Sequence, residues 1–325
     1  MSATIDLNRL VPVPVATLSS GIPYGFDLYV RDGCGKPLLY VGKDYCLSDS
    51  ELATLRDRGV RTLLIDCSAQ AAYEEHLRAL IDREWNLSPS TRFLAVKEAS
   101  RSLFMSALTS QSIDPLVRIT QDLADEMVEV ICAEDEVVET LMSLLGHDFS
   151  TYTHVTNVSF YCMAIANLYG VSDRQELTEI AVGGLLHDIG KRHVPGAILN
   201  APRKLTSHEF RTLKRHPTTG FAELSNVAGI TWPQLMMIYQ HHERMDGNGY
   251  PVGIDSSEIH WAGRLCAVAD VYDALSSHRP YRRAMPHKEI REYFRTNTHK
   301  QFDAELVACL DTLLCNSEKQ RELSL

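Results

Sequence analysis

The stretch LLHDIGK, residues 185–191, indicates both a fold and a chemistry for the second half of the chain. It ends an amphipathic pattern that predicts a helix with an inner apolar face of Leu177, Ile180, Ala181 and Leu185. His187 and Asp188 come at the end of that helix. Adjacent helical residues are separated by about 100° and about 1.5 Å of rise. Both side chains can therefore reach one metal cluster, and Asp188 can bridge two ions.

Further residues of the types that bind metals lie on both sides of this stretch. Twelve of the thirteen histidines lie from His147 onward. One expected helix has an apolar stripe of Val155, Val158, Cys162, Ile165 and Tyr169. The candidates are His154 in that helix, His216 in KRHPTTG, His241 and His242 in YQHHERMDGNGYP, and Asp270 in RLCAVADVYDAL, with Asp273 one helical turn later. Imidazole and carboxylate ligands together suit iron, manganese or zinc.

The number of these donors predicts a binuclear site. Six residues supply one donor each and a bridging Asp188 supplies two, which makes eight donors for two ions. Two six-coordinate ions then keep positions for a bridging hydroxide as nucleophile and for two phosphate oxygens. A lone His-Asp pair, or a histidine pair on an apolar helix, is more often a satisfied part of the core. The order and helical placement of the whole group nevertheless favour a two-metal hydrolase.

Residues 1–85 have the pattern of a small α+β domain. The runs FDLYVR (26–31) and KPLLYVG (36–42) flank DGCG and predict a hairpin. Ser48 and Glu51 form a capping box for a helix that Gly59 ends, and VRTLLID (60–66) predicts a buried strand. His76 stands alone on an expected helix, which favours a solvated surface histidine over a metal ligand.

Two further segments complete the expected organisation. Residues 86–145 predict connecting helices that offer a seam for a homodimer, with an acidic cluster that indicates a solvated helix face rather than a metal site: Glu134, Asp135 and Glu136. Residues 146–325 contain at least six helical patterns and no alternating strand. Capping boxes are expected at Ser172 with Gln175 and at Thr206 with Glu209. The fold class is therefore mainly α, preceded by a small α+β domain.

Composition narrows the classes of partner. The 325 residues carry 32 basic and 42 acidic side chains, a net charge of −10. This argues against a broad basic face for a nucleic acid polymer, whereas a small anion held by a metal or a few cations is compatible. Residues 153–172 are uncharged and long enough to span a bilayer, but their polar side chains predict a buried helix. With no signal-peptide pattern and eight cysteines without CxxC spacing, we expect reduced core cysteines in a cytoplasmic protein with no membrane partner.

Three motifs together resemble a known family. HDIGK (187–191), HHERMDGNGYP (241–251) and ADVYDAL (269–275) followed by RPYRRA (279–284) are similar to the HD-GYP domain of the HD superfamily. These bacterial phosphodiesterases hydrolyse cyclic dinucleotides, chiefly cyclic di-GMP. The resemblance covers about residues 146–315 and implies an HD-superfamily helical bundle at 146–325, with a regulatory or sensor module in front of it.

The resemblance also implies roles for individual residues. Lys191 would hold a phosphate and stabilise the transition state, and with Asp188 it forms the catalytic pair. Arg279 and Arg282 match positions that contact substrate phosphates, although surface cations are the alternative for both. Tyr250, in the GYP signature, would stack in the pocket or form a surface for GGDEF-type partner proteins, with Gly249 supplying backbone freedom. The metal ligands match His154, His187, Asp188, His216, His241, His242 and Asp270.

One departure from the family pattern bears on the number of metals. Some members hold a third metal with a glutamate four residues before the first histidine, where this chain has Ser150, and the nearest acid is Asp148. We therefore expect two divalent ions, iron or manganese, and hydrolysis of cyclic di-GMP to linear pGpG as the main product, with GMP as the alternative final product. Two alternatives stay open: a module that binds metal or nucleotide and signals through protein contacts, and a mononucleotide hydrolase. The GYP stretch argues against the second.

Overall fold

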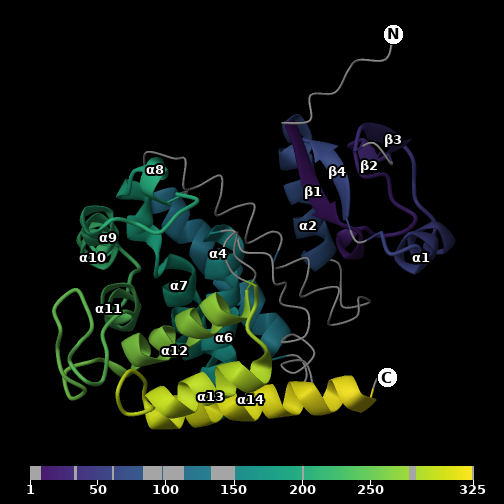
Figure 1. Ribbon diagram of the computed structural model, residues 1–325. Helices are drawn as coiled ribbons and strands as arrows, with labels where there is room; N and C mark the ends of the chain where they lie inside the picture. Colours follow the sequence, from purple (N-terminus) through teal and green to yellow (C-terminus); the bar gives the residue numbers. More distant parts are fainter. Residues whose placement is uncertain are drawn as a thin grey trace. The chain divides into compact units, whose positions relative to one another are not determined.

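A computed structural model describes residues 9–32, 35–60, 62–82, 97, 113–132, 151–199, 201–277 and 283–323. The chain divides into two compact units, Met1–Ser102 and Leu103–Leu325 (Figure 1). Helix α4 (Asp114–Ile131) falls in the segment expected to connect two domains, and it packs against helix α7 (Arg174–Leu186) of the second unit. The expected boundaries at residues 85 and 145 stay predictions.

The first unit contains a four-stranded antiparallel sheet in the order β1-β4-β2-β3. Its strands are β1 (Leu10–Pro14), β2 (Leu28–Arg31), β3 (Pro37–Val41) and β4 (Thr62–Asp66). The expected hairpin is β2–β3, and the expected buried strand is β4. The edge strand β1, which contains Pro12 and Pro14, was not among the expected elements. An edge strand tolerates them, since it needs hydrogen bonds on one side only.

Two helices accompany this sheet, and one of them corrects an expectation. Helix α1 (Asp49–Asp57) begins at the expected capping box of Ser48 with Glu51, and helix α2 (Gln70–Asp82) follows β4 through the short turn η3 (Cys67–Ala69). His76 on α2 was expected at the surface, but it is only 7% exposed. Its Nε2 lies 2.9 Å from the carbonyl oxygen of Thr17, and aromatic rings surround it. The hydrogen bond to this backbone carbonyl offsets the free-energy cost of burying the polar imidazole.

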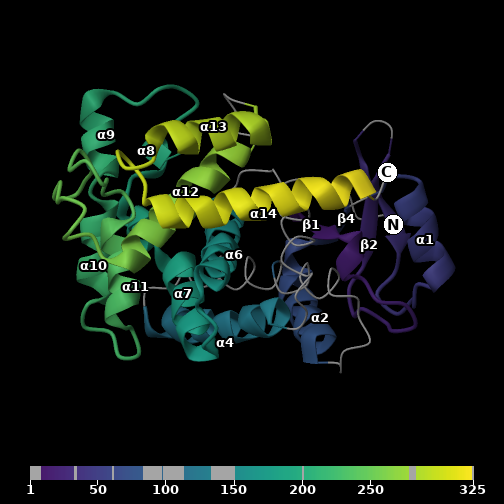
Figure 2. The same cartoon turned by 90° about the horizontal axis from the view of Figure 1, so that it is seen from below.

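The second unit is helical, as expected, and the part of residues 151–323 that is described contains no β-ladder beyond an isolated bridge. Helix α6 (Thr151–Tyr169) is central, with α7, α12 (Trp261–Ser276) and α14 (Ala304–Leu323) packed around it (Figures 1 and 2). The other elements are η4 (Ile189–His193), α8 (Gly196–Leu199), α9 (Ser207–Leu213), α10 (His216–Leu224), α11 (Trp232–Gln240) and α13 (His287–Asn297).

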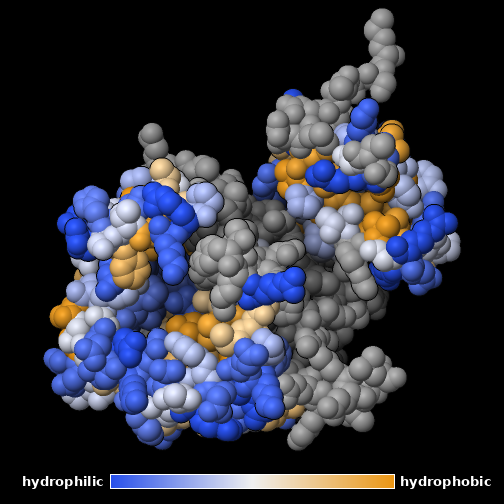
Figure 3. Space-filling view, in the orientation of Figure 1, coloured by the Kyte–Doolittle hydropathy of each residue, from blue (hydrophilic) through white to orange (hydrophobic). Residues whose placement is uncertain are grey.

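Helix α6 forms the core of this unit because its middle is uncharged on every side. Residues 154–166 are all buried, including four members of the expected stripe, but Tyr169 is 45% exposed and its hydroxyl donates to Glu305. No described helix is long and apolar enough to cross a membrane. On the face in Figure 3, hydrophilic side chains cover most of the rim of the second unit, and hydrophobic surface gathers in its central hollow.

Helix starts in this unit confirm one capping box and correct another. Thr206 and Glu209 form the expected box at the start of α9. The box expected at Ser172 is wrong by one residue, because Asp173 is the N-cap of α7 and accepts a hydrogen bond from the backbone N–H of Glu176. A carboxylate at the N-cap accepts a hydrogen bond from a backbone N–H group that has no partner within the helix, and its negative charge interacts favourably with the positive end of the helix dipole.

Candidate metal centre

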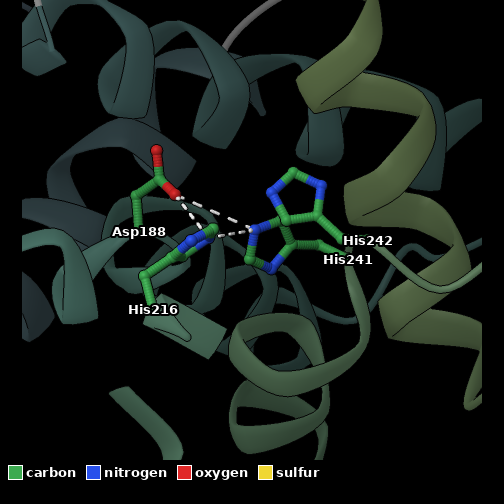
Figure 4. A group of neighbouring side chains, drawn as sticks. All are labelled: Asp188, His216, His241 and His242. Atoms are coloured by element: carbon green, nitrogen blue, oxygen red, sulfur yellow. Dashed lines mark hydrogen bonds and ion pairs between the residues drawn. The ribbon is translucent and has the colours of Figure 1, made fainter. Parts of the chain in front are cut away.

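The structure brings all seven expected ligands together from five helices and the turn after α7. They are contributed by α6 (His154), the C-cap of α7 (His187), the residue after it (Asp188), the first residue of α10 (His216), the two residues that follow α11 (His241 and His242) and α12 (Asp270). Two groups have ligand atoms within 4.8 Å of one another. The first is Asp188 with His216, His241 and His242 (Figure 4), and the second is His154, His187 and Asp188. Asp188 belongs to both groups.

The end of helix α7 sets the position of the central pair. The helix ends at Leu186, so His187 is its C-cap and Asp188 is the N-cap of the 3-10 turn η4. The expectation that both residues lie on one helix is therefore corrected. A Cβ atom at Gly190 would overlap the carbonyl oxygen of His216, so α10 packs directly on η4. This close approach puts His216 Nε2 3.2 Å from Asp188 Oδ1.

Backbone carbonyls orient three of the histidine rings. The Nδ1 atoms of His187, His216 and His241 lie 2.7, 2.8 and 2.9 Å from the carbonyl oxygens of the preceding helical turn. A carbonyl oxygen only accepts, so each Nδ1 carries the proton and donates. The Nε2 atoms, which face the cluster, then keep their lone pairs. This is the usual way in which proteins present imidazole to a metal.

His154 is oriented by a carboxylate instead. Its Nδ1 lies 2.7 Å from Asp273 Oδ2, while its Nε2 lies 3.1 Å from Asp270 Oδ1 and 3.6 Å from Asp188 Oδ2. Asp273 is 1% exposed, and its Oδ1 also accepts a hydrogen bond of 2.7 Å from Asn157. The spacing of Asp273 from Asp270 predicted that both lie on one helix face, but Asp273 was not among the expected ligands.

Burial and neighbouring charges shift the pKa values of the candidate ligands in different directions. Burial alone would lower the pKa of His154, but the Asp270 and Asp273 carboxylates outweigh it and raise that pKa to about 9. Burial lowers the pKa of His242 to about 3, and burial with the neighbouring histidines lowers that of His241. Burial would raise the pKa of Asp188, yet Lys191 and His187 hold it well below its usual value. Neutral imidazole and ionised carboxylate are the metal-binding forms.

These residues fit a divalent cation. His187 Nε2 and Asp188 Oδ1 are buried and have no hydrogen-bond partner among the described residues. Such atoms are costly to leave unsatisfied, and a cation would satisfy both. Imidazole nitrogens with carboxylate oxygens form a donor group suited to iron, manganese or zinc. The buried cluster is therefore compatible with divalent metal binding.

The expected substrate-binding residues are described only in part. The Lys191 ammonium contacts Asp188 Oδ2, and its side chain is 25% exposed, so it also reaches solvent. The ring of Tyr250 stacks on His242 with centroids 4.6 Å apart and planes at 28°. The remaining expectations lie outside the described residues: Arg279, Arg282, Ser150, Asp148 and the acidic cluster at 134–136.

Glu243, which the sequence analysis missed, holds the GYP loop against the cluster. It is 3% exposed and accepts hydrogen bonds from the backbone N–H groups of Val252 (2.7 Å) and Gly253. A Cβ atom at Gly249 would overlap Glu243 Cα, so the glycine allows the backbone of the GYP loop to approach the backbone of Glu243 closely. The expectation that Gly249 supplies an unusual backbone angle is wrong, because its φ is not positive. Its position directly after His241 and His242 was the feature of the sequence that could have indicated a role for Glu243 at the site.

Comparison with known proteins agrees with this geometry. The HD domain family matches residues 136–306, just over half of the chain, and that range contains every residue of the cluster. The chain is also similar to the cyclic di-GMP phosphodiesterase PA4108 of Pseudomonas aeruginosa, with 31% identity over 90% of this chain and 74% of that protein. The chain belongs to the HD-GYP family. The resemblance inferred from the three motifs is thereby confirmed.

Other relatives match a smaller share of this chain or share its fold. A cyclic di-GMP phosphodiesterase of Thermotoga maritima is 38% identical over 53% of this chain and 47% of its own length. The 3′3′-cGAMP-specific phosphodiesterase 3 of Vibrio cholerae is 34% identical over 56% of this chain and 40% of its own length. The chain thus spans less than half of each of these two proteins. Bd1817, a HDG"Y"P protein from Bdellovibrio bacteriovorus, shares the fold, with a TM-score of 0.67 at 19% identity over 94% of this chain and 99% of its own.

Proposed function

We propose that this HD-GYP chain is a metal-dependent phosphodiesterase that opens a cyclic dinucleotide, with cyclic di-GMP as substrate and linear pGpG as main product. The observation that carries the proposal is the convergence of five histidines and Asp270 with buried Asp188, which belongs to both donor groups and contacts the ammonium of Lys191. The names of the relatives support the substrate class, because they include enzymes for cyclic di-GMP and for 3′3′-cGAMP.

The two donor groups, which share Asp188, would hold two divalent ions, iron or manganese. When bound, such ions supply Lewis acidity toward phosphoryl oxygens and activate water as a nucleophile. The protein keeps the imidazoles of His241 and His242 neutral and the carboxyl of Asp188 ionised, so these ligands need no proton removed at neutral pH. Burial of the cluster excludes bulk water and strengthens each charge interaction inside it.

Lys191 would bind a phosphoryl oxygen and stabilise the charge that develops there. Its ammonium contacts Asp188 and is partly exposed, so a substrate can reach it. Replacing Lys191 with alanine should lower turnover at least about tenfold, a loss of about 1.4 kcal/mol of transition-state stabilisation. Elemental analysis of the variant should find the parent's metal content. Normal turnover would reduce Lys191 to an ordinary surface cation.

The direct test is metal content and turnover of protein purified without oxygen or chelator. We expect two ions per chain and conversion of cyclic di-GMP to pGpG, followed by chromatography over time. Three tightly bound ions would contradict the two-metal centre. Bound metal without any turnover would instead favour a module that signals through protein contacts. Binding of GGDEF-type proteins through the GYP loop, homodimer formation and cytoplasmic location stay predictions from the sequence.

A further inference from the structure

A pocket of about 220 Å³ adjoins the metal centre on the side of the GYP loop. His241 and His242 form part of its wall, so it opens onto the candidate ligands. Phe210 and Lys214, at the end of α9, and Tyr250 of the GYP loop form another part. Neither the metal ligands nor Lys191 accounts for this pocket or for the presence of Lys214 in its wall.

Lys214 places a positive charge in this pocket. Its Nζ lies 4.7 Å from the ring centroid of Tyr250 and 5.1 Å from that of Phe210. The faces of aromatic rings attract an ammonium ion and restrict its position. Tyr250 in turn stacks on His242, so one aromatic ring separates the ammonium from a candidate metal ligand.

The charge of Lys214 is not neutralised within the described part of the chain. None of the described carboxylates forms an ion pair with it. The other cation of the pocket is Arg244, which is paired through two nitrogens with Asp246 at 3.1 and 2.9 Å. The acidic residue of the pocket, Glu243, accepts hydrogen bonds from the backbone N–H groups of Val252 and Gly253, so Lys214 is the lining cation that no described carboxylate pairs with, in a chain whose net charge is −10. An ammonium held between rings, with donors only, is a site for an anion.

We infer that this pocket is the subsite for the second phosphate of the substrate, and that Lys214 binds that phosphate while the metal centre holds the one being cleaved. The inference rests on the proposed function. A cyclic dinucleotide carries two phosphodiesters, and the second must be neutralised when the ligand enters a partly buried site. A substrate with a single phosphodiester makes no such contact. Lys214 therefore selects dinucleotides by their second charge.

The test compares two diesters on the full-length, metal-loaded protein. Cyclic di-GMP has two phosphates, and bis(4-nitrophenyl) phosphate has one. The variants are Lys214→Ala, Lys214→Arg as the charge-preserving change, and Lys204→Ala as the control, because Lys204 is an exposed lysine that does not line the pocket. All variants are first compared with the parent for metal content and thermal unfolding.

We expect Lys214→Ala to raise KM for cyclic di-GMP about tenfold, with kcat and the kinetics of the single-phosphate diester within about twofold of the parent. Lys214→Arg should recover most of the affinity, and Lys204→Ala should match the parent. An unchanged KM would overturn the inference. Equal loss with both diesters would also overturn it, because Lys214 would then act on the metal centre in general.

Failure of the proposed function gives a different result. If the parent leaves cyclic di-GMP intact, the phosphodiesterase proposal fails for this substrate, and equilibrium binding of cyclic di-GMP is measured for the same variants. Weaker binding by Lys214→Ala alone would support the subsite, and equal binding by all variants would overturn it.

Discussion

At the scale of single residues, Asp273 determines which nitrogen of His154 faces the cluster. Its two oxygens accept hydrogen bonds from His154 Nδ1 and from Asn157, and it is buried between α6 and α12. A carboxylate behind a ligating histidine fixes the tautomer and makes the imidazole a stronger ligand. Asp273 is therefore a positioning residue for the metal centre.

Replacing Asp273 with asparagine should weaken metal binding. An asparagine has one acceptor oxygen, so it cannot serve both His154 and Asn157 as the carboxylate does. We expect the affinity for Mn²⁺ to fall about 10- to 100-fold, measured by calorimetric titration of the metal-free protein. Asp311→Asn makes the same chemical change at a surface ion pair with Arg291 and should leave affinity unchanged. Equal affinities in both variants would show that Asp273 only supports the fold.

Metal binding should also depend on pH through His154. The pKa of His154 is raised to about 9, so its imidazole holds a proton at neutral pH that must leave when a metal binds. Affinity should therefore rise with pH, by about tenfold per unit between pH 6.5 and 8.5, and level off above the pKa. His242, whose pKa is lowered to about 3, adds no dependence in this range. Calorimetry in two buffers should count about one released proton, and a flat affinity would contradict this.

Sequence order and residue type could predict the seven candidate ligands, because five lie inside the three motifs and the other two, His154 and His216, are metal-binding residue types in the same ordered series. They could not predict what meets a side chain across a helix interface. The spacing of Asp273 placed it on the face of Asp270, but its contact with His154 arises only when α6 packs on α12. His76 was misplaced for the same reason, since its backbone partner Thr17 is 59 residues away.

At the scale of elements, the contact of η4 with α10 joins the two donor groups. A Cβ atom at Gly190 would overlap the His216 carbonyl oxygen and crowd the backbone of Gly220. Backbone cannot move aside as a side chain can, so a larger residue here separates the elements. His216 would then move away from Asp188.

Gly190→Ala should destabilise the second unit by at least about 2 kcal/mol and weaken metal binding. Gly183→Ala is the matched control, because its Cβ would meet the side chain of Met237, which can adopt other rotamers. We expect urea unfolding to show the larger loss for Gly190→Ala. Two variants of equal stability would mean that the η4–α10 contact can open at little cost.

Element starts and ends were predictable where the signal is local. The capping boxes at Ser48 and Thr206 depend on residues three apart, and both form. The start of α7 was missed by one residue because Ser172 and Asp173 are both good caps, and the fold selects Asp173. The end of α7 before Asp188 had no local stop signal, since it follows from the packing of η4 on α10.

At the scale of the whole molecule, metal occupancy should set the stability of the second unit. The cluster buries the carboxylates of Asp188 and Asp270 together with several imidazoles, and a bound cation compensates that charge. Free metal at about 100 times its Kd adds about 2.7 kcal/mol to the free energy of unfolding. Chelation should therefore lower Tm, and Mn²⁺ should restore it.

Hydrogen exchange locates this effect. Removing the metal should speed exchange in α7, α11 and α12, which carry ligands, and leave β2 and β4 of the first unit unchanged, since none of the candidate donor groups found among the described residues lies there. Equal acceleration in both units would show that the metal stabilises the chain globally, and no change in Tm would argue against a bound ion.

The prolines of β1 also affect how copies of this protein behave in concentrated solution. The strand lies at the border of its sheet, where an unpaired backbone can recruit a strand from a neighbouring molecule. Pro12 and Pro14 carry no N–H group, so that border lacks two of the donors that such recruitment needs. Intermolecular sheet growth, the first step toward fibrous aggregates, is therefore disfavoured along β1.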